Sequence, residues 1–191
     1  MMSKATYRQF FLEKRKLLST MDVYNRSLLI ADRFVKNFIT TDITSVHTFL
    51  PIEERNEVYT WFIIHEINMH YKHIQLICPV VNTENKSMRH ALLTPNTPIR
   101  INSYGIPEPE TQITFTDVPD IVLVPLVAID KYGNRLGYGK GYYDRFLSTI
   151  DRSCLKIALS LEEPIEYLMH DHHDVPMDYC ITPSCIYKYS L

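Results

Sequence analysis

"DIVLVPLVAIDKYGNRLGYGKGYYDRF", residues 120–146, decides the fold. It opens with an apolar run at 120–130, continues through a segment that holds four of the chain's five glycines, and leads into "GYYDRFLSTI" at 141–150. The apolar run predicts a buried strand, and the last segment predicts a helix. A strand that leads through a glycine-rich loop into a helix is typical of α/β sheets, in which ligands bind beyond the carboxyl ends of the strands.

The glycines of this stretch need a physical reason, because each one costs folding about 0.5–1 kcal/mol relative to alanine where ordinary backbone angles would serve. A flexible linker is the simplest alternative, but linkers are rich in glycine and serine. Residues 131–146 instead contain tyrosines, arginines, lysines and an aspartate. We therefore expect the backbone amides of this loop to approach a ligand closely, as they do where glycine-rich loops wrap phosphates.

The loop matches neither of the two common nucleotide motifs. It is not a Walker A loop, because Gly141 stands where a serine or threonine would hold magnesium, and its G-x-G-x-G spacing is not the dinucleotide fingerprint. Its charged residues nevertheless suit a nucleotide. Arg135, Lys140 and the loop amides can face phosphates, while Asp144 can bind the accompanying magnesium.

Composition predicts one globular domain spanning residues 1–191. The chain is 46% hydrophobic and 22% charged, with a net charge of −2, which gives no electrostatic footprint for nucleic acid or an anionic membrane. The N-terminus lacks the apolar stretch of a secretory signal, and no apolar run reaches 18 residues, so we expect a cytoplasmic protein that binds no membrane. The four cysteines show no C-x-x-C spacing and are expected to be reduced thiols.

Helices and strands alternate along the predicted chain. We expect helices at 3–19, 22–39 and 53–72, and strands at 45–50, 73–81, 154–161 and 179–187, with an irregular, proline-punctuated excursion at 82–119. This order predicts an α/β fold, a single-domain three-layer sandwich with a largely parallel central sheet and helices on both faces.

The first predicted helix has a possible N-cap at Ser3 and an apolar face. Lys4 and Arg8 are four residues apart and therefore share another face. The residues expected to point inward are Tyr7, Phe10, Phe11, Leu17 and Leu18.

Five ordered blocks resemble the 5-formyltetrahydrofolate cyclo-ligase family, also called 5,10-methenyltetrahydrofolate synthetases. They are K-x-x-x-R at Lys4 and Arg8, E-V-x-T from Glu57, "GIPEP" at 105–109, "PLVAIDKYGNRLGYGKGYYDR" at 125–145 and "HDVPMDYCITP" at 173–183. A match confined to glycines would be weak. Blocks spread in order over nearly the whole chain make the resemblance specific.

This resemblance implies an ATP- and magnesium-dependent conversion of 5-formyltetrahydrofolate to 5,10-methenyltetrahydrofolate, through phosphorylation of the formyl oxygen. It implies small-molecule substrates, and we expect a monomer. The implied catalytic residues are Lys4, Arg8 and Arg135, and the implied metal ligands are Asp144 and Asp174. The implied ATP site comprises Lys4, Arg8, Arg135, Leu136, Gly137, Tyr138, Gly139, Lys140, Gly141, Tyr142 and Tyr143. The implied folate site comprises Ile52, Glu57, Tyr104, Tyr138, Gly139, Lys140, Gly141 and Tyr142.

Each assignment has a plainer alternative. Lys4 and Arg8 alone would be a solvated helix face, and Asp144 could simply complement a helix dipole. Glu57 could be a surface carboxylate, although a buried carboxylate would suit the paired donors of a pterin edge. Tyr104 could belong to the core rather than lie beside a pterin or adenine.

Two further features of the sequence stay open. The cluster "HDHHD" at 170–174 could suggest zinc through His170, His172 and His173, whereas the family resemblance favours magnesium at Asp174 with peripheral histidines. Val80 stands where the family commonly has an arginine, which leaves contacts to the substrate tail undefined.

Two other functions fit part of the pattern. A folate- or nucleotide-binding regulator would keep the fold without turnover, but it would not need Lys4, Arg8, Arg135 and Asp144 together. A sugar-phosphate isomerase on a similar sandwich would need a general base and no ATP, so dependence on ATP separates it from a cyclo-ligase.

Overall fold

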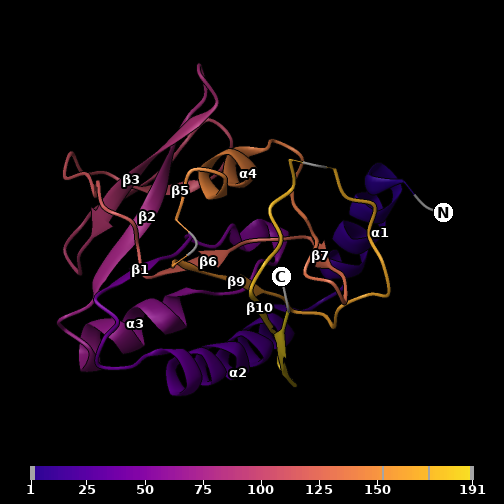
Figure 1. Cartoon of the computed structure of the whole chain (residues 1–191), viewed down its shortest axis with the longest axis horizontal. Coiled ribbons are helices and arrows are strands. Elements are labelled where there is room, and N and C mark those ends of the chain that lie inside the picture. Colours follow the sequence, from indigo (N-terminus) through magenta and orange to yellow (C-terminus); the bar gives the residue numbers. More distant parts are fainter. Residues whose placement is uncertain (1–2, 152, 172, 190–191) are drawn as a thin grey trace.

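A computed structural model describes residues 3–151, 153–171 and 173–189. Its main feature is a seven-stranded sheet with the order β11-β10-β9-β6-β1-β2-β3 (Figure 1). The strands of this sheet are β1 (Ser45–His47), β2 (Gln75–Asn82), β3 (Ser87–Leu93), β6 (Ile121–Val124), β9 (Leu155–Leu159), β10 (Tyr179–Ile181) and β11 (Ile186–Lys188). The inner pairs are parallel, and only β3 and β11, at the two edges, run antiparallel to their neighbours. The predicted, largely parallel α/β sheet is confirmed.

Helices cover both faces of the sheet. Figure 1 shows α2 (Thr20–Phe38) and α3 (Trp61–His70) along one face and α4 (Tyr142–Leu147) on the other. The side chains of β6 alternate accordingly. Leu123 joins the cluster that contains Phe34 of α2, whereas Val122 joins the cluster that contains Leu147 of α4. The predicted three layers therefore follow from strand residues that are apolar on both faces.

The predicted strand at 120–130 is in fact two strands. β6 ends before Pro125, which has no N–H to donate to a sheet ladder, and β7 (Ala128–Ile129) then pairs antiparallel with β8 (Arg135–Leu136). This small sheet lies next to α1 (Lys4–Lys16), whose Phe11 packs in a cluster with Leu136. The break after β6 thus turns the chain out of the main sheet and toward α1.

The expectation of an irregular excursion at 82–119 is wrong for three segments. β3 pairs with β2 over seven residues, from Leu76 opposite Leu93 to Asn82 opposite Ser87. The other two segments, β4 (Ile99–Ile101) and β5 (Pro107–Pro109), form a separate hairpin. Five prolines and several polar residues obscured a strand that is only partly buried.

The helix predicted at 53–72 begins later. Glu53–Arg55 form a single 3-10 turn that ends at Asn56, whose φ of 49° lies in the left-handed region, and α3 starts at Trp61. Helix α2 starts slightly earlier than predicted, at Thr20, because Ser19 and Asp22 form a capping box. The strands predicted at 45–50, 154–161 and 179–187 are shorter, and the last is divided by a turn at Pro183.

In α1, Ser3 accepts a hydrogen bond from the amide of Thr6, so the predicted N-cap is confirmed. The predicted inward face is wrong at two positions: Phe10 is 55% exposed and Leu17 is 86% exposed. The buried residues of this helix are Phe11 and Arg15.

Within the described residues, none of the helices combines the length and apolar character that a bilayer crossing requires. All four cysteines are free thiols, as predicted. Burial raises the pKa of the Cys154 thiol to about 12, which keeps it protonated and unreactive at neutral pH.

Phe34→Ala tests the packing of α2 on the sheet. The Phe34 side chain is fully buried, so its truncation should lower the free energy of unfolding by about 3–5 kcal/mol through lost burial and the cavity left behind. Leu28→Ala is the matched control on the same helix, because Leu28 is 55% exposed and should cost well under half as much. Equal decreases in the free energy of unfolding of the two variants, measured by urea denaturation, would contradict the packing of the Phe34 face of α2 on the sheet.

Candidate functional site

A cavity of about 660 Å³ lies beyond the carboxyl ends of β1 and β6. Every residue that the sequence singled out for the site lines it: Lys4, Arg8, Ile52, Glu57, Tyr104, Arg135, Leu136, Gly137, Tyr138, Gly139, Lys140, Gly141, Tyr142, Tyr143, Asp144 and Asp174. These side chains come from α1, from the segments after β1 and β6, from the β4–β5 hairpin and from the loop before β10. The fold therefore brings together residues that are up to 170 positions apart.

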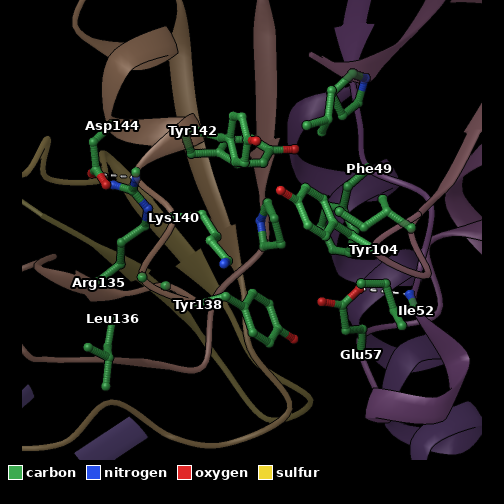
Figure 2. A pocket seen from close by; sticks show the side chains of 18 of the residues that line it. Phe49, Ile52, Glu57, Tyr104, Arg135, Leu136, Tyr138, Lys140, Tyr142 and Asp144 are labelled. Atoms are coloured by element: carbon green, nitrogen blue, oxygen red, sulfur yellow. Dashed lines mark hydrogen bonds and ion pairs between the residues drawn. The ribbon is translucent and has the colours of Figure 1, made fainter. Parts of the chain in front are cut away.

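One end of the cavity holds cations paired with carboxylates. Lys4 Nζ lies 2.7 Å from Asp171 Oδ2 and 2.5 Å from Asp174 Oδ2. Arg135, which is buried, donates through Nη2 to Asp144 Oδ1 at 2.6 Å and through Nη1 to the carbonyl of Val175. These pairs place two cations and three carboxylates at one end of the cavity (Figure 2 shows the Arg135 pair).

The charged side chains at this end of the cavity stabilise one another in their charged forms. Burial alone would lower the pKa of Lys4, but its hydrogen bonds to Asp171 and Asp174 outweigh burial and raise that pKa. Burial would likewise raise the pKa of Asp174, yet the Lys4 ammonium and the Asp171 amide hold it below its ordinary value. Lys4 and Asp174 are therefore both charged at neutral pH.

Arg8 closes the glycine loop against α1. Its Nε donates to the carbonyl of Gly137 at 2.8 Å, and its guanidinium lies over Gly139. A methyl group on Gly139 would meet Arg8 Cζ at 3.3 Å, and the φ of +86° at this glycine is unfavourable for any other residue. Gly137 differs, because a methyl group there would point into open space.

The other end of the cavity is mainly apolar and contains one buried carboxylate. Figure 2 shows Phe49, Ile52 and Glu57 on the side of the cavity opposite Arg135. Glu57 is only 6% exposed, and its Oε2 accepts a hydrogen bond from the amide of Ile52 at 2.8 Å. Glu57 is therefore not the surface carboxylate of the plainer alternative.

The pKa of Glu57 is raised above its ordinary value, because burial disfavours the charged form. The amide of Ile52, the hydroxyl of Tyr138 and the positive charges of Arg15 and Arg55 oppose this rise. Tyr138 thus connects the glycine loop with the carboxylate at the apolar end.

The mouth of the cavity is flanked by the β4–β5 hairpin and the glycine loop. Tyr104, at the hairpin tip, is 42% exposed, and Lys140 Nζ lies 5.6 Å from the centre of its ring. Tyr104 is therefore a surface residue at the cavity rather than part of the core.

The carboxylates fit magnesium. Mg²⁺ is commonly held by one or two carboxylates together with substrate phosphates, and Asp144 and Asp174 both line the cationic end of the cavity. Among residues 3–151, 153–171 and 173–189, no group of three or more His, Cys, Asp or Glu side chains is arranged to hold a metal ion. The zinc alternative cannot be followed in full, because His172 lies outside the described residues.

Three charged residues of this region were not predicted from the sequence. Asp171 lies within the "HDHHD" cluster but was not assigned, and Arg55 lies over the Tyr138 ring at 5.3 Å. Arg15 is four residues after the buried Phe11, and that spacing was a usable signal. Val80 is buried in β2 and, unlike its neighbours Pro79 and Val81, does not line the cavity.

Comparison with known proteins gives consistent results. The sequence model of the 5-formyltetrahydrofolate cyclo-ligase family matches residues 1–183. A 5-formyltetrahydrofolate cyclo-ligase from Haemophilus influenzae is 36% identical over 130 residues, which are 63% of this chain and 67% of that protein.

Two solved structures are similar in fold. A 5,10-methenyltetrahydrofolate synthetase from Mycoplasma pneumoniae has a TM-score of 0.76 at 27% identity, with 95% of this chain and 99% of that chain covered. The NMR structure of an Aquifex aeolicus 5,10-methenyltetrahydrofolate synthetase has a TM-score of 0.82 at 27% identity, with 100% and 96% covered.

Two glycine substitutions distinguish the effect of an added methyl group on ligand binding from its effect on backbone strain. Gly137→Ala should leave the thermal midpoint nearly unchanged, yet it should weaken nucleotide binding if the loop backbone contacts phosphate. Gly139→Ala should in addition lower the free energy of unfolding by about 1–3 kcal/mol, because its φ is positive. Calorimetry with and without ATP checks both; a Gly137→Ala protein that binds ATP as the wild type does would contradict close approach at this position.

Lys4→Met tests the pairing of α1 with the 171–174 segment. At pH 7 it should reduce the free energy of unfolding by at most about 1 kcal/mol, because the pair is partly exposed. The folded-state pKa of Asp174 is depressed, so its stabilising contribution is present above the ordinary value of 3.8 and is lost as pH falls through the folded pKa. The difference between wild type and variant should therefore shrink in acid; a difference that grows in acid would contradict the pairing.

Proposed function

Because the chain belongs to the 5-formyltetrahydrofolate cyclo-ligase family, we propose that it converts 5-formyltetrahydrofolate to 5,10-methenyltetrahydrofolate. The reaction consumes ATP with magnesium and releases ADP and phosphate. The protein acts on these small molecules as a cytoplasmic monomer whose single domain spans residues 1–191.

The observation that carries this proposal is the division of one cavity into two chemically different ends. Lys4, Arg8 and Arg135 surround the end beside the glycine loop, where a polyphosphate would be neutralised. Glu57 lies at the apolar end, where its buried carboxylate suits the paired N–H donors of a pterin. A cavity of about 660 Å³ lies within the size range of small-molecule sites, and its two ends suit two different reactants.

The proposed chemistry requires alignment rather than a protein nucleophile. The formyl oxygen attacks the γ-phosphorus of ATP, the bond from that phosphorus to the bridging oxygen breaks, and ADP leaves. The neighbouring nitrogen of the folate then attacks the activated formyl carbon and loses its proton. Phosphate finally departs with the original formyl oxygen, which leaves the methenyl bridge between the two nitrogens.

The basic side chains serve the first step by lowering the cost of the charge on the transferring group. Arg135 is held in place by Asp144 and by the Val175 carbonyl, so its guanidinium is preorganised. Arg8 bonds the Gly137 carbonyl and lies over Gly139, which holds the backbone of the loop in place beside the cavity. Magnesium held by Asp144 and Asp174 would neutralise part of the phosphate charge.

The arrangement of the basic side chains in the cavity favours this function over a regulatory binding protein and over a sugar-phosphate isomerase. A binding protein that only regulates would gain nothing from a buried arginine and a lysine at the same end of the cavity as the glycine loop. A sugar-phosphate isomerase needs a base beside its substrate carbon, and the buried carboxylate of Glu57 lies at the apolar end.

Purified protein incubated with 5-formyltetrahydrofolate, ATP and magnesium should form the methenyl product, which is followed by its absorbance. Omission of ATP or chelation of magnesium should abolish the signal, because the formyl oxygen must first be phosphorylated. Product without ATP, or ATP hydrolysis with no consumption of folate, would refute the proposal.

Asp144→Asn should raise the magnesium concentration needed for half-maximal turnover by about 10-fold or more, because an amide is a weaker ligand than a carboxylate. Asp32→Asn is the matched control, since Asp32 is also ion-paired with a basic side chain but lies on α2 and does not line the cavity. The measurement is the turnover rate of each variant as a function of magnesium concentration. The same shift in both variants, or in neither, would remove Asp144 from the metal site.

A further inference from the structure

Arg15 is a buried charge outside the cavity. It lies in the last turn of α1 and is 8% exposed, although arginine is rarely buried without partners. Its Nη2 donates to the carbonyls of Leu126 and Val127 at 2.8 and 3.2 Å, and its Nη1 donates to the hydroxyl oxygen of Tyr138 at 3.1 Å. The guanidinium therefore spans from the turn after β6 to the glycine loop.

The contact with Arg15 sets the direction of the Tyr138 hydroxyl. A guanidinium has donors and no acceptor, so the Tyr138 oxygen can only accept from it. The single phenolic proton is then free for another partner, and the Glu57 carboxylate is the acceptor that lies beside this hydroxyl. Hydrogen bonds that run in one direction strengthen each other in a site of low polarity.

The main chain at the end of α1 and just beyond it holds the same region. Asn56, which directly precedes Glu57, donates through Nδ2 to the carbonyl of Arg15 at 2.9 Å and to that of Leu18 at 3.0 Å. Arg15 thus contacts both the residue next to Glu57 and the hydroxyl that faces Glu57. The end of α1 fixes where this carboxylate lies.

The other groups around Glu57 are few. The amide of Ile52 donates to it, Arg55 of the 3-10 turn and Arg15 of α1 supply positive charge, and Tyr138 and Tyr143 are the neighbouring phenols. Arg55 is exposed to solvent, which screens its charge. Arg15 is the buried cation of this set, and its effect is the less screened of the two.

We infer that Arg15 is a positioning residue for the folate: through the Tyr138 hydroxyl and the backbone beside Asn56 it holds the Glu57 carboxylate in place as an acceptor for the donors of the bound folate. The identity of the ligand rests on the proposed function. The effect of Arg15 on Glu57 is a property of the protein alone and is independent of that function. Arg15 itself is not among the residues that line the cavity.

The direct test is a pH titration of the Glu57 carboxyl carbon by NMR in the free protein, with Glu57→Gln used to assign the resonance. Arg15→Met should raise the Glu57 midpoint by about one pH unit, and Arg15→Lys, which keeps a charge but not the fork of donors, should raise it less. Arg33→Met is the control, because Arg33 also donates to a backbone carbonyl, that of Pro183, but lies on α2, which contributes no residue to the cavity that Tyr138 and Glu57 line. An Arg15→Met protein that melts as the wild type does and has an unchanged Glu57 midpoint would overturn the inference.

Turnover provides the second readout. Arg15→Met should raise KM for 5-formyltetrahydrofolate about 10-fold with KM for ATP unchanged, and the acid limb of kcat/KM should move up by the same amount as the Glu57 midpoint. Equal changes in both KM values without a shift of the acid limb would mean a purely structural role.

If Arg15→Met does not fold, Tyr138→Phe must raise the Glu57 midpoint, and an unchanged midpoint in that variant overturns the inference. A wild-type protein that makes no methenyl product would refute the proposed function, while the titration would still decide the effect of Arg15 on Glu57.

Discussion

The hydrogen bonds of the buried Arg15 guanidinium hold together the segments that form the walls of the cavity. Pro125 ends β6 and leaves the carbonyls of Leu126 and Val127 without a place in the main sheet, and Arg15 satisfies both. Unpaired buried carbonyls would each cost about 1–3 kcal/mol, so this turn needs such a donor. Because Arg15 also binds Tyr138, the same residue ties α1 to the glycine loop.

The chemistry of the cavity follows from where α1 is held. With its last turn fixed by Arg15, the first turns of the helix lie along the glycine loop, and Lys4 and Arg8 reach the cavity. Lys4 and Arg135 are each paired with carboxylates there, so cations and anions are concentrated at one end without a large net charge. In the proposed reaction, a magnesium–phosphate complex would enter by exchange of partners within this set, so that no buried charge is left uncompensated.

The sequence predicted the sheet well, because buried strands leave a local apolar pattern, whereas the site residues came mainly from the family resemblance. Apolar runs such as 121–124 mark strands that are buried on both faces, and the glycine segment marks where the chain leaves the sheet. The sixteen predicted site residues all line one cavity, although their roles toward ATP, folate and metal remain predictions. Strand β3 was missed because its residues are only partly buried and lack a clear alternation.

The features that the sequence did not predict depend on contacts between residues far apart in the chain. Arg15 was not assigned a role, since its spacing from Phe11 indicates burial but does not show that the carbonyls of 126 and 127 would lie against it. Phe10 and Leu17 looked like core residues for the same reason, because helical spacing does not reveal which face meets the small β7–β8 sheet. The segment 53–60 failed as a helix because Asn56 adopts a left-handed φ and Glu57 turns back to the amide of Ile52.

The central claim is that the formyl oxygen is phosphorylated within this one cavity. The most direct test is turnover of 5-formyltetrahydrofolate labelled with oxygen-18 in the formyl group, followed by mass analysis of the released phosphate. Each released phosphate should carry one labelled oxygen, because the formyl oxygen leaves bonded to phosphorus. Unlabelled phosphate, with the heavy oxygen found in water or retained in the folate, would contradict it.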